Sequence, residues 1–335
     1  MRAFEYERPA DPASALTALA GDPSAMPLAG GTNLVDLMRL GVERPGRLVD
    51  INRIDFGGVE PLPDGRVRIG AGVRNSDLAA HPLVRERFPV LAKALLAGAS
   101  GQLRNRASVG GNLLQRTRCV YFTDVTKPCN KREPGSGCPA VEGASRELGI
   151  LGVSAHCIAT QPGDMAVALA ALDAVVVVTT LNGTRSIPVT EFHRLPGDHP
   201  ERDTELPKSA LVTSIEIPGL RFSAVSTYRK ARDRRSYAFA LGSVAAALDV
   251  EDGTVRDVRL ALGSVAPRPW RAFLAEDALR GGPATRAAFE AAADLELSDA
   301  RTTEENAFKV PLMRRLVGGV LAELAGLATR PEVVA

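Results

Sequence analysis

Two similar glycine-containing stretches, Ala29-Gly30-Gly31-Thr32-Asn33-Leu34 and Ser108-Val109-Gly110-Gly111-Asn112-Leu113, stand about eighty residues apart in the chain. Because glycine has no Cβ, the backbone at such a turn can come close to an anion, and successive N–H groups can form a positive concavity for phosphate oxygens. Two such turns could hold a diphosphate from both sides. Neither matches the G-x-G-x-x-G or the P-loop pattern, so no motif supports a Rossmann domain or a nucleoside triphosphatase. Taken singly, either stretch also suits an ordinary strand-to-helix turn.

The residues around the first turn predict alternating strands and helices. Met26 to Ala29 forms a short apolar strand before the glycines, and the apolar positions from Leu34 to Leu40 recur with helical spacing until Gly41. Upstream, Asp11 followed by Pro12 predicts a helix start, because aspartate can cap free N–H groups and proline is tolerated in the first turn. Further strands are expected at residues 48–51 and 67–70, and helices from residue 75 and at residues 89–97.

No periodicity is visible from Gly101 to Gly163, and all four cysteines lie inside this stretch. After it, Asp164 is expected to cap an apolar helix at residues 165–172, which leads into a buried strand and an Asn182-Gly183 hairpin. Residues 191–208 are polar and suit a linker. Beyond them we expect a small antiparallel sheet backed by helices, with strands at residues 211–217, 239–250 and 255–265.

The composition indicates a folded chain of about two domains in 335 residues. Hydrophobic residues make up 45% and charged residues 24%, and the 41 basic and 39 acidic side chains nearly cancel. A nucleic-acid-binding surface usually needs a larger basic excess, so nucleic acid is not expected as a partner. The longest apolar stretch, residues 166–178, is interrupted by Asp173 and too short to span a bilayer, and the N-terminus lacks the apolar core of a signal peptide. No membrane association is expected.

Three stretches, in this order along the chain, resemble the FAD-binding subunit of the molybdenum hydroxylases. This is the family of xanthine dehydrogenase and carbon monoxide dehydrogenase. The three stretches are residues 27–34, residues 101–112, and residues 164–174, in which Asp164 opens a mostly apolar stretch. The resemblance implies an α+β fold: a PCMH-type FAD-binding domain like that of vanillyl-alcohol oxidase, made of two α/β subdomains, followed by a C-terminal domain like that of the carbon monoxide dehydrogenase flavoprotein, with an antiparallel sheet and helices. The expected FAD-binding domain covers residues 1–205, with subdomains at about 1–56 and 57–205 and an insertion at about 115–160, and the C-terminal domain covers 206–335.

The same resemblance implies which residues hold FAD. The two turns would surround the pyrophosphate, and Asp164 would hydrogen-bond a polar group of the cofactor, a role compatible with a plain helix cap. Tyr228 and Lys230 would contact the cofactor, although they stand at the start of a basic run that charge alone would assign to a solvated face. The implied set is Pro27, Leu28, Ala29, Gly30, Gly31, Thr32, Asn33, Leu34, Arg106, Ser108, Gly110, Gly111, Asn112, Asp164, Tyr228 and Lys230.

The four cysteines, Cys119, Cys129, Cys138 and Cys157, are separated by nine, eight and eighteen residues, and no C-x-x-C pair occurs. The crowding of every cysteine into one stretch argues against unrelated core thiols. The spacing leaves three alternatives open: two disulfides, a zinc site with four cysteines, or an iron–sulfur cluster. Spacing alone favours neither metal nor disulfide.

The residues beside these cysteines resemble the insertion in the flavin subunit of periplasmic aldehyde oxidoreductases and, less closely, of 4-hydroxybenzoyl-CoA reductase. In those relatives the insertion binds a [4Fe–4S] cluster, so the resemblance implies that all four cysteines ligate one here. Arg118, Lys127, Lys131 and Arg132 would then offset the negative charge of the cluster. His156 is an alternative ligand, but a surface or supporting role is expected beside four cysteines. Ligand spacing is absent at His81, His193 and His199.

No arrangement of serine, histidine and aspartate, no H-E-x-x-H helix and no paired catalytic carboxylates stand out, so we place no substrate-transforming site in this chain. The resemblance implies the electron-transfer subunit of a molybdenum-dependent aldehyde oxidoreductase. A large molybdenum-cofactor subunit would oxidise the substrate, a small subunit would pass electrons through two [2Fe–2S] clusters, and this chain would deliver them to an acceptor. A heterotrimer or a multiple of one is expected.

Two other functions stay open on the sequence. One is a stand-alone flavin oxidase or reductase, which would turn over substrate by itself. The other is a zinc-stapled nucleotide-binding protein without a redox role, which would be colourless. The compartment is open between cytoplasm and periplasm, because the related periplasmic enzymes fold in the cytoplasm and are exported on a partner's twin-arginine signal.

Overall fold

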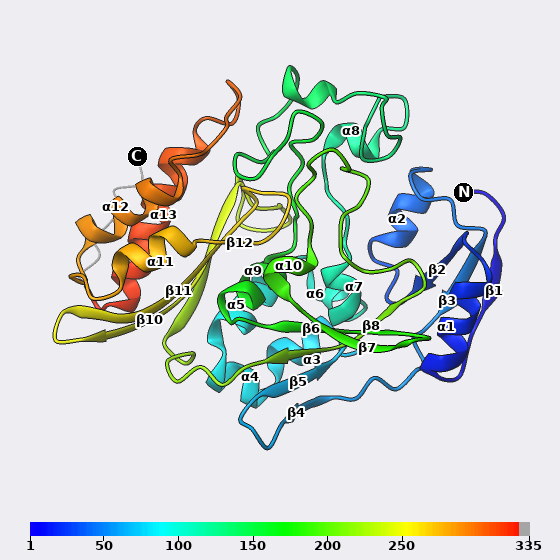
Figure 1. The fold of residues 1–335 in the computed structure, drawn as a ribbon, viewed down its shortest axis with the longest axis horizontal. Coiled ribbons are helices and arrows are strands. Elements are labelled where there is room, and N and C mark those ends of the chain that lie inside the picture. The colour runs from blue at the N-terminus through cyan, green and yellow to red at the C-terminus, as the bar shows by residue number, and fades with distance from the viewer. Residues whose placement is uncertain (328–335) are drawn as a thin grey trace.

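The computed structural model describes residues 1–327 and arranges them in the three parts that Figure 1 shows. The N-terminal subdomain holds a parallel sheet in the order β1-β3-β2. Its first helix has the expected cap: Ser14 donates its backbone N–H to Asp11 Oδ1 at 2.8 Å, and Pro12 opens the helix. The elements are β1 (Glu5–Glu7), α1 (Pro12–Gly21), β2 (Ala25–Leu28), α2 (Leu34–Arg39) and β3 (Arg47–Asp50).

The central subdomain is built on an antiparallel sheet of five strands in the order β4-β5-β8-β6-β7. The strands are β4 (Val59–Pro61), β5 (Val67–Gly70), β6 (Val175–Thr180), β7 (Gly183–Pro188) and β8 (Leu211–Ile217). The helices are α3 (Asn75–Ala80), α4 (Pro82–Arg87), α5 (Pro89–Ala97), α6 (Gly101–Arg104), α7 (Val109–Leu113), α8 (Val120–Thr123), α9 (Asp164–Ala171) and α10 (Val189–Phe192).

Strand β8 corrects the expected domain boundary at residue 206. Ile215 of this strand lies opposite Ile69 of β5 on one side and opposite Val176 of β6 on the other, so β8 is part of the central sheet. The chain therefore enters the C-terminal domain only after Ile217. Alternating apolar residues predict a strand, but they do not say which sheet the strand joins.

The C-terminal domain has the expected antiparallel sheet, in the order β12-β11-β10-β9, with helices beside it. Its long hairpin turns at Asp252 and Gly253, which both have positive φ, as an Asp-Gly pair predicts. The elements are β9 (Ser226–Ala231), β10 (Gly242–Glu251), β11 (Thr254–Gly263), β12 (Trp270–Arg271), α11 (Phe273–Leu279), α12 (Arg286–Glu296) and α13 (Lys309–Leu324). The last expected residues of this domain, 328–335, lie outside the described residues.

Both faces of this C-terminal sheet are buried. Ala245 of β10 and Ala261 of β11 belong to the core of the central subdomain, whereas Val244 and Ala246 belong to a second core with α11, α12 and α13. Successive side chains of a strand point to opposite faces of its sheet. The sheet is therefore packed between the central subdomain and its own helices, which fixes the two domains against each other.

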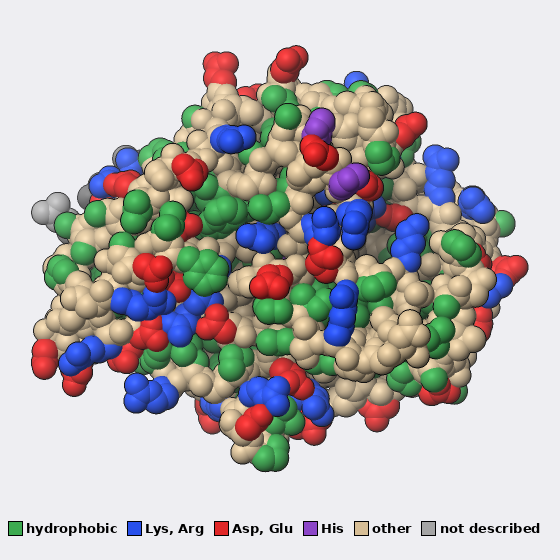
Figure 2. Space-filling view, viewed as in Figure 1, with side chains coloured by type: hydrophobic (Ala, Val, Ile, Leu, Met, Phe, Trp, Pro, Cys, Tyr) green, Lys and Arg blue, Asp and Glu red, His purple; other side chains and the backbone are tan. Residues whose placement is uncertain are grey.

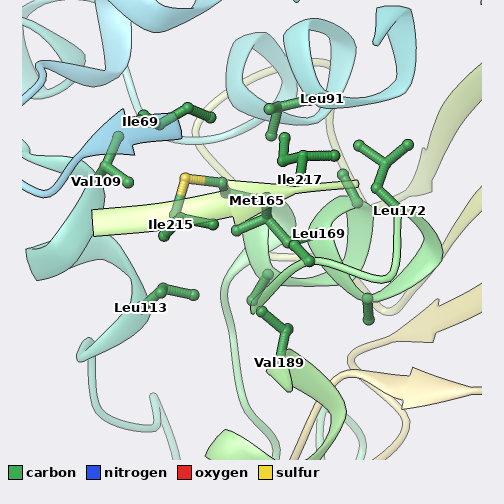
Figure 3. Packing of buried hydrophobic residues seen from close by; sticks show 14 of the residues in the cluster. Ile69, Leu91, Val109, Leu113, Met165, Leu169, Leu172, Val189, Ile215 and Ile217 are labelled. Carbon is green, nitrogen blue, oxygen red and sulfur yellow. The ribbon is translucent and has the colours of Figure 1, made fainter. Parts of the chain in front are cut away.

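Helix α9 lies at the centre of the larger core. Figure 3 shows Met165 and Leu169 of this helix close to Ile215 and Ile217 of β8, with Leu91 of α5 nearby. Every residue of α9 is buried, because α5, β10 and β11 also pack against it. A helix that is apolar on all sides is one that is covered on all sides.

The cysteine-containing insertion, residues 115–160, lies at the top of the view in Figure 1 and contains only α8 and a short 3₁₀ helix, Pro139–Val141. In Figure 2, acidic and basic side chains are interspersed over the visible face, in line with the small net charge. Within residues 1–327, no helix is both long enough and apolar enough to cross a bilayer.

Candidate cofactor site

The two glycine turns lie face to face between the N-terminal and central subdomains. A Cβ on Gly30 would lie 2.0 Å from the backbone oxygen of Arg106, and a Cβ on Gly111 would lie 3.8 Å from the Cβ of Ala29. Gly31 has a φ of +74°, a conformation that favours glycine. At position 30, only a residue without a side chain allows the backbones of the two subdomains to approach this closely.

The first turn offers a run of free backbone donors that includes both of its glycines, whereas both glycines of the second turn are already paired. Within residues 1–327, the backbone N–H groups of Gly30 to Asn33 donate to no protein acceptor. In the second turn, Gly110 donates its N–H to Ala71 O at 2.9 Å and Gly111 donates to Ser108 Oγ at 3.2 Å. Successive unpaired N–H groups are suited to an anion. The first turn therefore supplies the donors, and the second supplies the space opposite them.

Two adjoining cavities lie beside the turns, and we call them the two lobes of the site. The larger lobe, about 690 Å³, is lined by the N-terminal and central subdomains, and the smaller lobe, about 540 Å³, also reaches the C-terminal domain. Gly31, Thr32, Asn33 and Gly111 line both lobes, so the lobes meet where the turns meet. This shape fits a dinucleotide, in which a pyrophosphate joins two ring systems.

Asn33 carries a buried donor at this junction. Its Oδ1 accepts the backbone N–H of Arg116 at 3.0 Å, whereas its Nδ2 has no hydrogen-bond partner in the described chain. An unpaired buried polar group costs about 1–3 kcal/mol. A ligand with an acceptor at the junction would remove that cost, so the residues present fit a phosphate-containing cofactor.

Most of the expected cofactor residues line the cavity. Besides the four shared residues, the larger lobe is lined by Pro27, Ala29, Gly30, Leu34, Ser108 and Gly110, and the smaller by Asn112, Asp164 and Lys230. Three expected residues, Leu28, Arg106 and Tyr228, are not among the described lining. Leu28 O and Arg106 O instead accept hydrogen bonds from Asn52 Nδ2 at 3.3 Å and Arg74 Nη1 at 2.8 Å, two side chains that line the larger lobe.

Several lining residues have no motif that would reveal them. Glu43, Arg116 and Asp203 reach the larger lobe from loops, as does His81, which the sequence left without a role. Tyr237 and Phe239 line the smaller lobe, and these residues are 65% and 44% exposed. Tyr237 and Phe239 follow a basic run in a chain with only 4% aromatic residues, and this is the sequence feature that could have pointed to them.

Asp164 does not cap its helix, contrary to expectation. The N-cap of α9 is Gly163, and no side-chain cap bond is formed. Instead, Asp164 Oδ2 accepts a hydrogen bond from Lys230 Nζ at 2.8 Å, and its Oδ1 accepts one from the Tyr228 hydroxyl. Burial, and then the Asp164 carboxylate, raise the pKa of Tyr228 well above its usual value. A buried lysine and its counterion therefore form part of the wall of the smaller lobe.

The four cysteines come together around one small cavity. All four are free thiols, three of them buried, and together with Lys131 and His156 they line a space of about 10 Å³. Asn130 joins the loops around it, because its Nδ2 donates to His156 O at 3.0 Å and its Oδ1 accepts the Gly137 N–H at 2.8 Å. The structure thus has no disulfide among these residues, and the fold brings the expected set to one place.

The geometry around the thiols does not suit a single small ion. Zinc holds four thiolates at about 2.3 Å, which requires tightly grouped sulfurs, and no group of three or more His, Cys, Asp or Glu residues within residues 1–327 could hold one metal ion. Burial raises the pKa of Cys119 to about 11 and also raises that of Cys157. The thiol donor set suits iron–sulfur chemistry, but a cluster would have to push the lining outward.

The expected positive charges around the cysteines are mostly engaged elsewhere. Arg118 Nη1 donates to Asp36 Oδ2 at 2.8 Å, and Arg132 Nη1 donates to the backbone oxygens of Tyr121 and Phe122. Lys131 Nζ lies 2.5 Å from Asp203 Oδ1. Of the four basic residues, Lys131 is the one that lines the cysteine cavity.

Comparison with known proteins gives two family matches that divide the chain as the fold does. Residues 2–220 match the FAD binding domain in molybdopterin dehydrogenase, and residues 226–324 match the CO dehydrogenase flavoprotein C-terminal domain. The chain is 49% identical to the aldehyde oxidoreductase FAD-binding subunit PaoB of Escherichia coli (strain K12), over 96% of this chain and 98% of that protein. It is 28% identical to the carbon monoxide dehydrogenase medium chain of Hydrogenophaga pseudoflava, over 90% of this chain and 88% of that one. A solved structure of carbon monoxide dehydrogenase from the same organism superposes with a TM-score of 0.75 at 27% identity, covering 97% of this chain and 98% of that chain.

Proposed function

The chain belongs to the FAD-binding medium subunits of the molybdenum hydroxylase family, and from this we propose that it binds FAD and a [4Fe–4S] cluster and transfers electrons within an aldehyde oxidoreductase. The observation that carries the FAD assignment is the two-lobed cavity with the unpaired Asn33 amide where its lobes meet. A family match over both domains and a relative at 49% identity support the same assignment.

Different residues of the cavity would bind different parts of the cofactor. The free N–H groups of Gly30 to Asn33 and the Asn33 amide would donate to the pyrophosphate. We assign the isoalloxazine ring to the smaller lobe, where Asp164 holds the Lys230 ammonium in the wall, and adenosine to the larger lobe. Bound FAD supplies the redox chemistry, since it can accept electrons singly and release them in pairs.

The cluster assignment rests on the donor set of the insertion. Four free cysteines line one cavity, and thiolates are the usual ligands of iron–sulfur clusters. The insertion is anchored to the rest of the protein: Ser145 donates its N–H to Glu305 Oε2 at 2.7 Å, and Ile150 donates to Val265 O at 2.7 Å. An anchored loop can keep four ligands at fixed positions.

The partners follow from the family. Relatives of this chain are named as medium chains or FAD-binding subunits, and we propose that this protein likewise works with a large molybdenum-cofactor subunit and a small [2Fe–2S] subunit, as a heterotrimer or a multiple of one. Substrate oxidation would take place on the large subunit. The relative at 49% identity makes an aldehyde the proposed substrate class.

Anaerobic purification with flavin, iron and sulfide analysis tests the proposal. The wild type should carry FAD and about four irons per chain, and Cys129→Ser should lose most of the iron. Val125→Ser is a matched control, because Val125 is an exposed residue of the same insertion that does not line the described cavity. Protein with flavin but no iron would contradict the cluster, and colourless folded protein would contradict both cofactors.

A further inference from the structure

The segment that leaves the second glycine turn is bonded to both ends of α2, the helix that follows the first turn. Arg116 donates its backbone N–H to Oδ1 of the N-cap residue Asn33 at 3.0 Å. Its Nη1 donates to Glu43 Oε1 at 2.6 Å. Glu43 is fixed just beyond the C-terminal end of α2, because its backbone N–H donates to Leu37 O at 3.2 Å. A single residue, Arg116, therefore contacts both ends of the helix.

Two further ion pairs complete this attachment. Arg118 Nη1 donates to Asp36 Oδ2 on α2 at 2.8 Å, and Arg116 Nε donates to Asp203 Oδ2 of the central subdomain at 2.7 Å. Burial disfavours the charged guanidinium of Arg116, but its two carboxylate partners outweigh this and raise its pKa. Charge-assisted hydrogen bonds are short and strong. We call residues 116–118 the strap, because they fasten α2 of the N-terminal subdomain to the central subdomain.

The strap determines which way the Asn33 amide points. A backbone N–H can donate only to the oxygen of an amide, so the bond from Arg116 directs Oδ1 toward the strap and leaves Nδ2 unpaired at the junction of the lobes. The ion pairs keep the N-cap of α2 within reach of that N–H. The backbone of the first turn is held separately, because Asn52 Nδ2 donates to Ala29 O at 2.8 Å. The effect of the strap on the cofactor site is therefore confined to Asn33.

We propose that Arg116 is a positioning residue for FAD, which holds the Asn33 amide in the orientation that donates to the pyrophosphate. The inference rests on the proposed function, because it needs a cofactor with a pyrophosphate. The bonds of the strap are made within the chain, so the amide is ordered before FAD binds and FAD does not bear that cost. The residues that the resemblance implies for FAD binding include Asn33 but neither Arg116 nor its two carboxylate partners.

Removing carboxylates from α2 and its C-terminal end separates this role from simple electrostatics. Glu43 lines the larger lobe and Asp36 the smaller, so their neutralisation removes negative charge beside an anionic ligand. By charge alone, Asp36→Asn combined with Glu43→Gln should tighten FAD binding. A guanidinium of Arg116 that itself bound phosphate would also bind more tightly once freed from Glu43. A positioning role predicts the opposite sign, because the strap then loses its two ion pairs with the N-terminal subdomain.

A mutant cycle in the full-length protein tests the proposal. FAD dissociation constants are measured by fluorescence titration of deflavinated protein for the wild type, Asn33→Ala, Asp36→Asn with Glu43→Gln, and all three substitutions together. We expect Asn33→Ala to raise the dissociation constant about tenfold or more, through the loss of one hydrogen bond to a charged group. Neutralising both carboxylates should raise it about fivefold when Asn33 is present, but less than about twofold in the Asn33→Ala background, because the strap acts through that amide.

Glu5→Gln with Glu7→Gln is the matched control. It neutralises two exposed carboxylates that pair with Arg47 in the same subdomain and lie outside the described lining of both lobes, so FAD affinity should change less than about twofold. Thermal melting identifies the folded variants. If Asp36→Asn with Glu43→Gln does not fold, Asp203→Asn releases the same guanidinium from the central subdomain and takes its place in the cycle.

The outcomes separate the positioning role from the proposed function. Unchanged or tighter FAD binding after both carboxylates are neutralised overturns the positioning role alone. A loss of affinity that persists in the Asn33→Ala background also overturns it, because the carboxylates would then act on FAD by another route. A folded wild-type protein that binds no FAD overturns the proposed function and this inference with it.

Discussion

The close approach of the two glycine turns predicts that Gly30→Ala impairs FAD binding. A Cβ at this position would lie 2.0 Å from Arg106 O and 2.7 Å from Arg106 C. Both are backbone atoms, so no side chain can rotate away to make room. The first turn would have to retreat from residues 106–107 by more than an ångström, and it carries the free N–H groups of Gly30 to Asn33.

The size of the effect follows from the donors that this shift would misplace. A hydrogen bond to a charged group contributes about 1.5–3 kcal/mol. A retreat of more than an ångström should cost one or two such bonds to the pyrophosphate. A loss of about 3 kcal/mol of binding free energy raises the FAD dissociation constant roughly a hundredfold.

The assay is a fluorescence titration of deflavinated protein with FAD. Gly101→Ala is the control, because a Cβ on Gly101, at the start of α6 in the central subdomain, meets nothing within 4 Å. Circular dichroism and thermal melting must first show that both variants are folded. A folded Gly30→Ala protein that binds FAD as tightly as Gly101→Ala would refute the reasoning from backbone approach.

Three further substitutions test other parts of the structure. Gly111→Val should abolish FAD retention, because its methyl groups would enter the gap toward Ala29, whose Cβ is 3.8 Å from the added Cβ; an unaltered flavin content in folded protein would contradict this. Asp164→Asn leaves the Lys230 ammonium buried without its counterion, which should cost about 3–5 kcal/mol of stability and lower the melting temperature, and an unchanged melting temperature would count against the pair. Lys309 is fully buried, and burial lowers its pKa from 10.5 to about 7. Between pH 7 and 10.5 this lysine is therefore protonated in the unfolded chain but neutral in the folded one. The free energy of unfolding should rise with pH over this range, by at most about 1.4 kcal/mol per pH unit. Denaturant unfolding at pH 7 and 9 measures this rise. The free energy of unfolding should rise less for Lys309→Met than for the wild type, and equal rises would show that Lys309 does not cause the pH dependence.

Features with a local cause could be predicted from the sequence. The Asp11 cap and the Asp252-Gly253 hairpin depend on residues within one turn of each other, and both are confirmed. Strand β8 was predicted as a strand but assigned to the wrong sheet. Its register with β5 pairs Ile215 with Ile69, a contact between segments far apart in the chain that no local pattern encodes.

The basic run shows the same limit for a candidate site residue. Charge density assigns residues 229–235 to a solvated face, yet the Lys230 side chain is only 4% exposed. The ammonium can be buried there because Asp164, on α9, accepts a hydrogen bond at 2.8 Å from Lys230, on β9. A buried charge is tolerated only with such a partner, so the environment of Lys230 depends on a contact that only the fold creates. A resemblance could point to both residues, but not to their pairing with each other.

The cysteine insertion shows this limit most clearly, because the spacing of its four cysteines did not distinguish disulfides from a metal site. The fold decides part of the question: the thiols are free, and Asn130 ties the loops so that all four line one cavity. Burial also raises the pKa of Cys119 to about 11, so this thiol keeps its proton at neutral pH unless a metal replaces it. A buried thiol of this kind is a poor nucleophile for disulfide exchange, since the thiolate is the reactive form. The same burial that protects the Cys119 thiol from oxidation therefore makes metal binding by this residue a competition with protons, and sequence spacing carries no information about that cost.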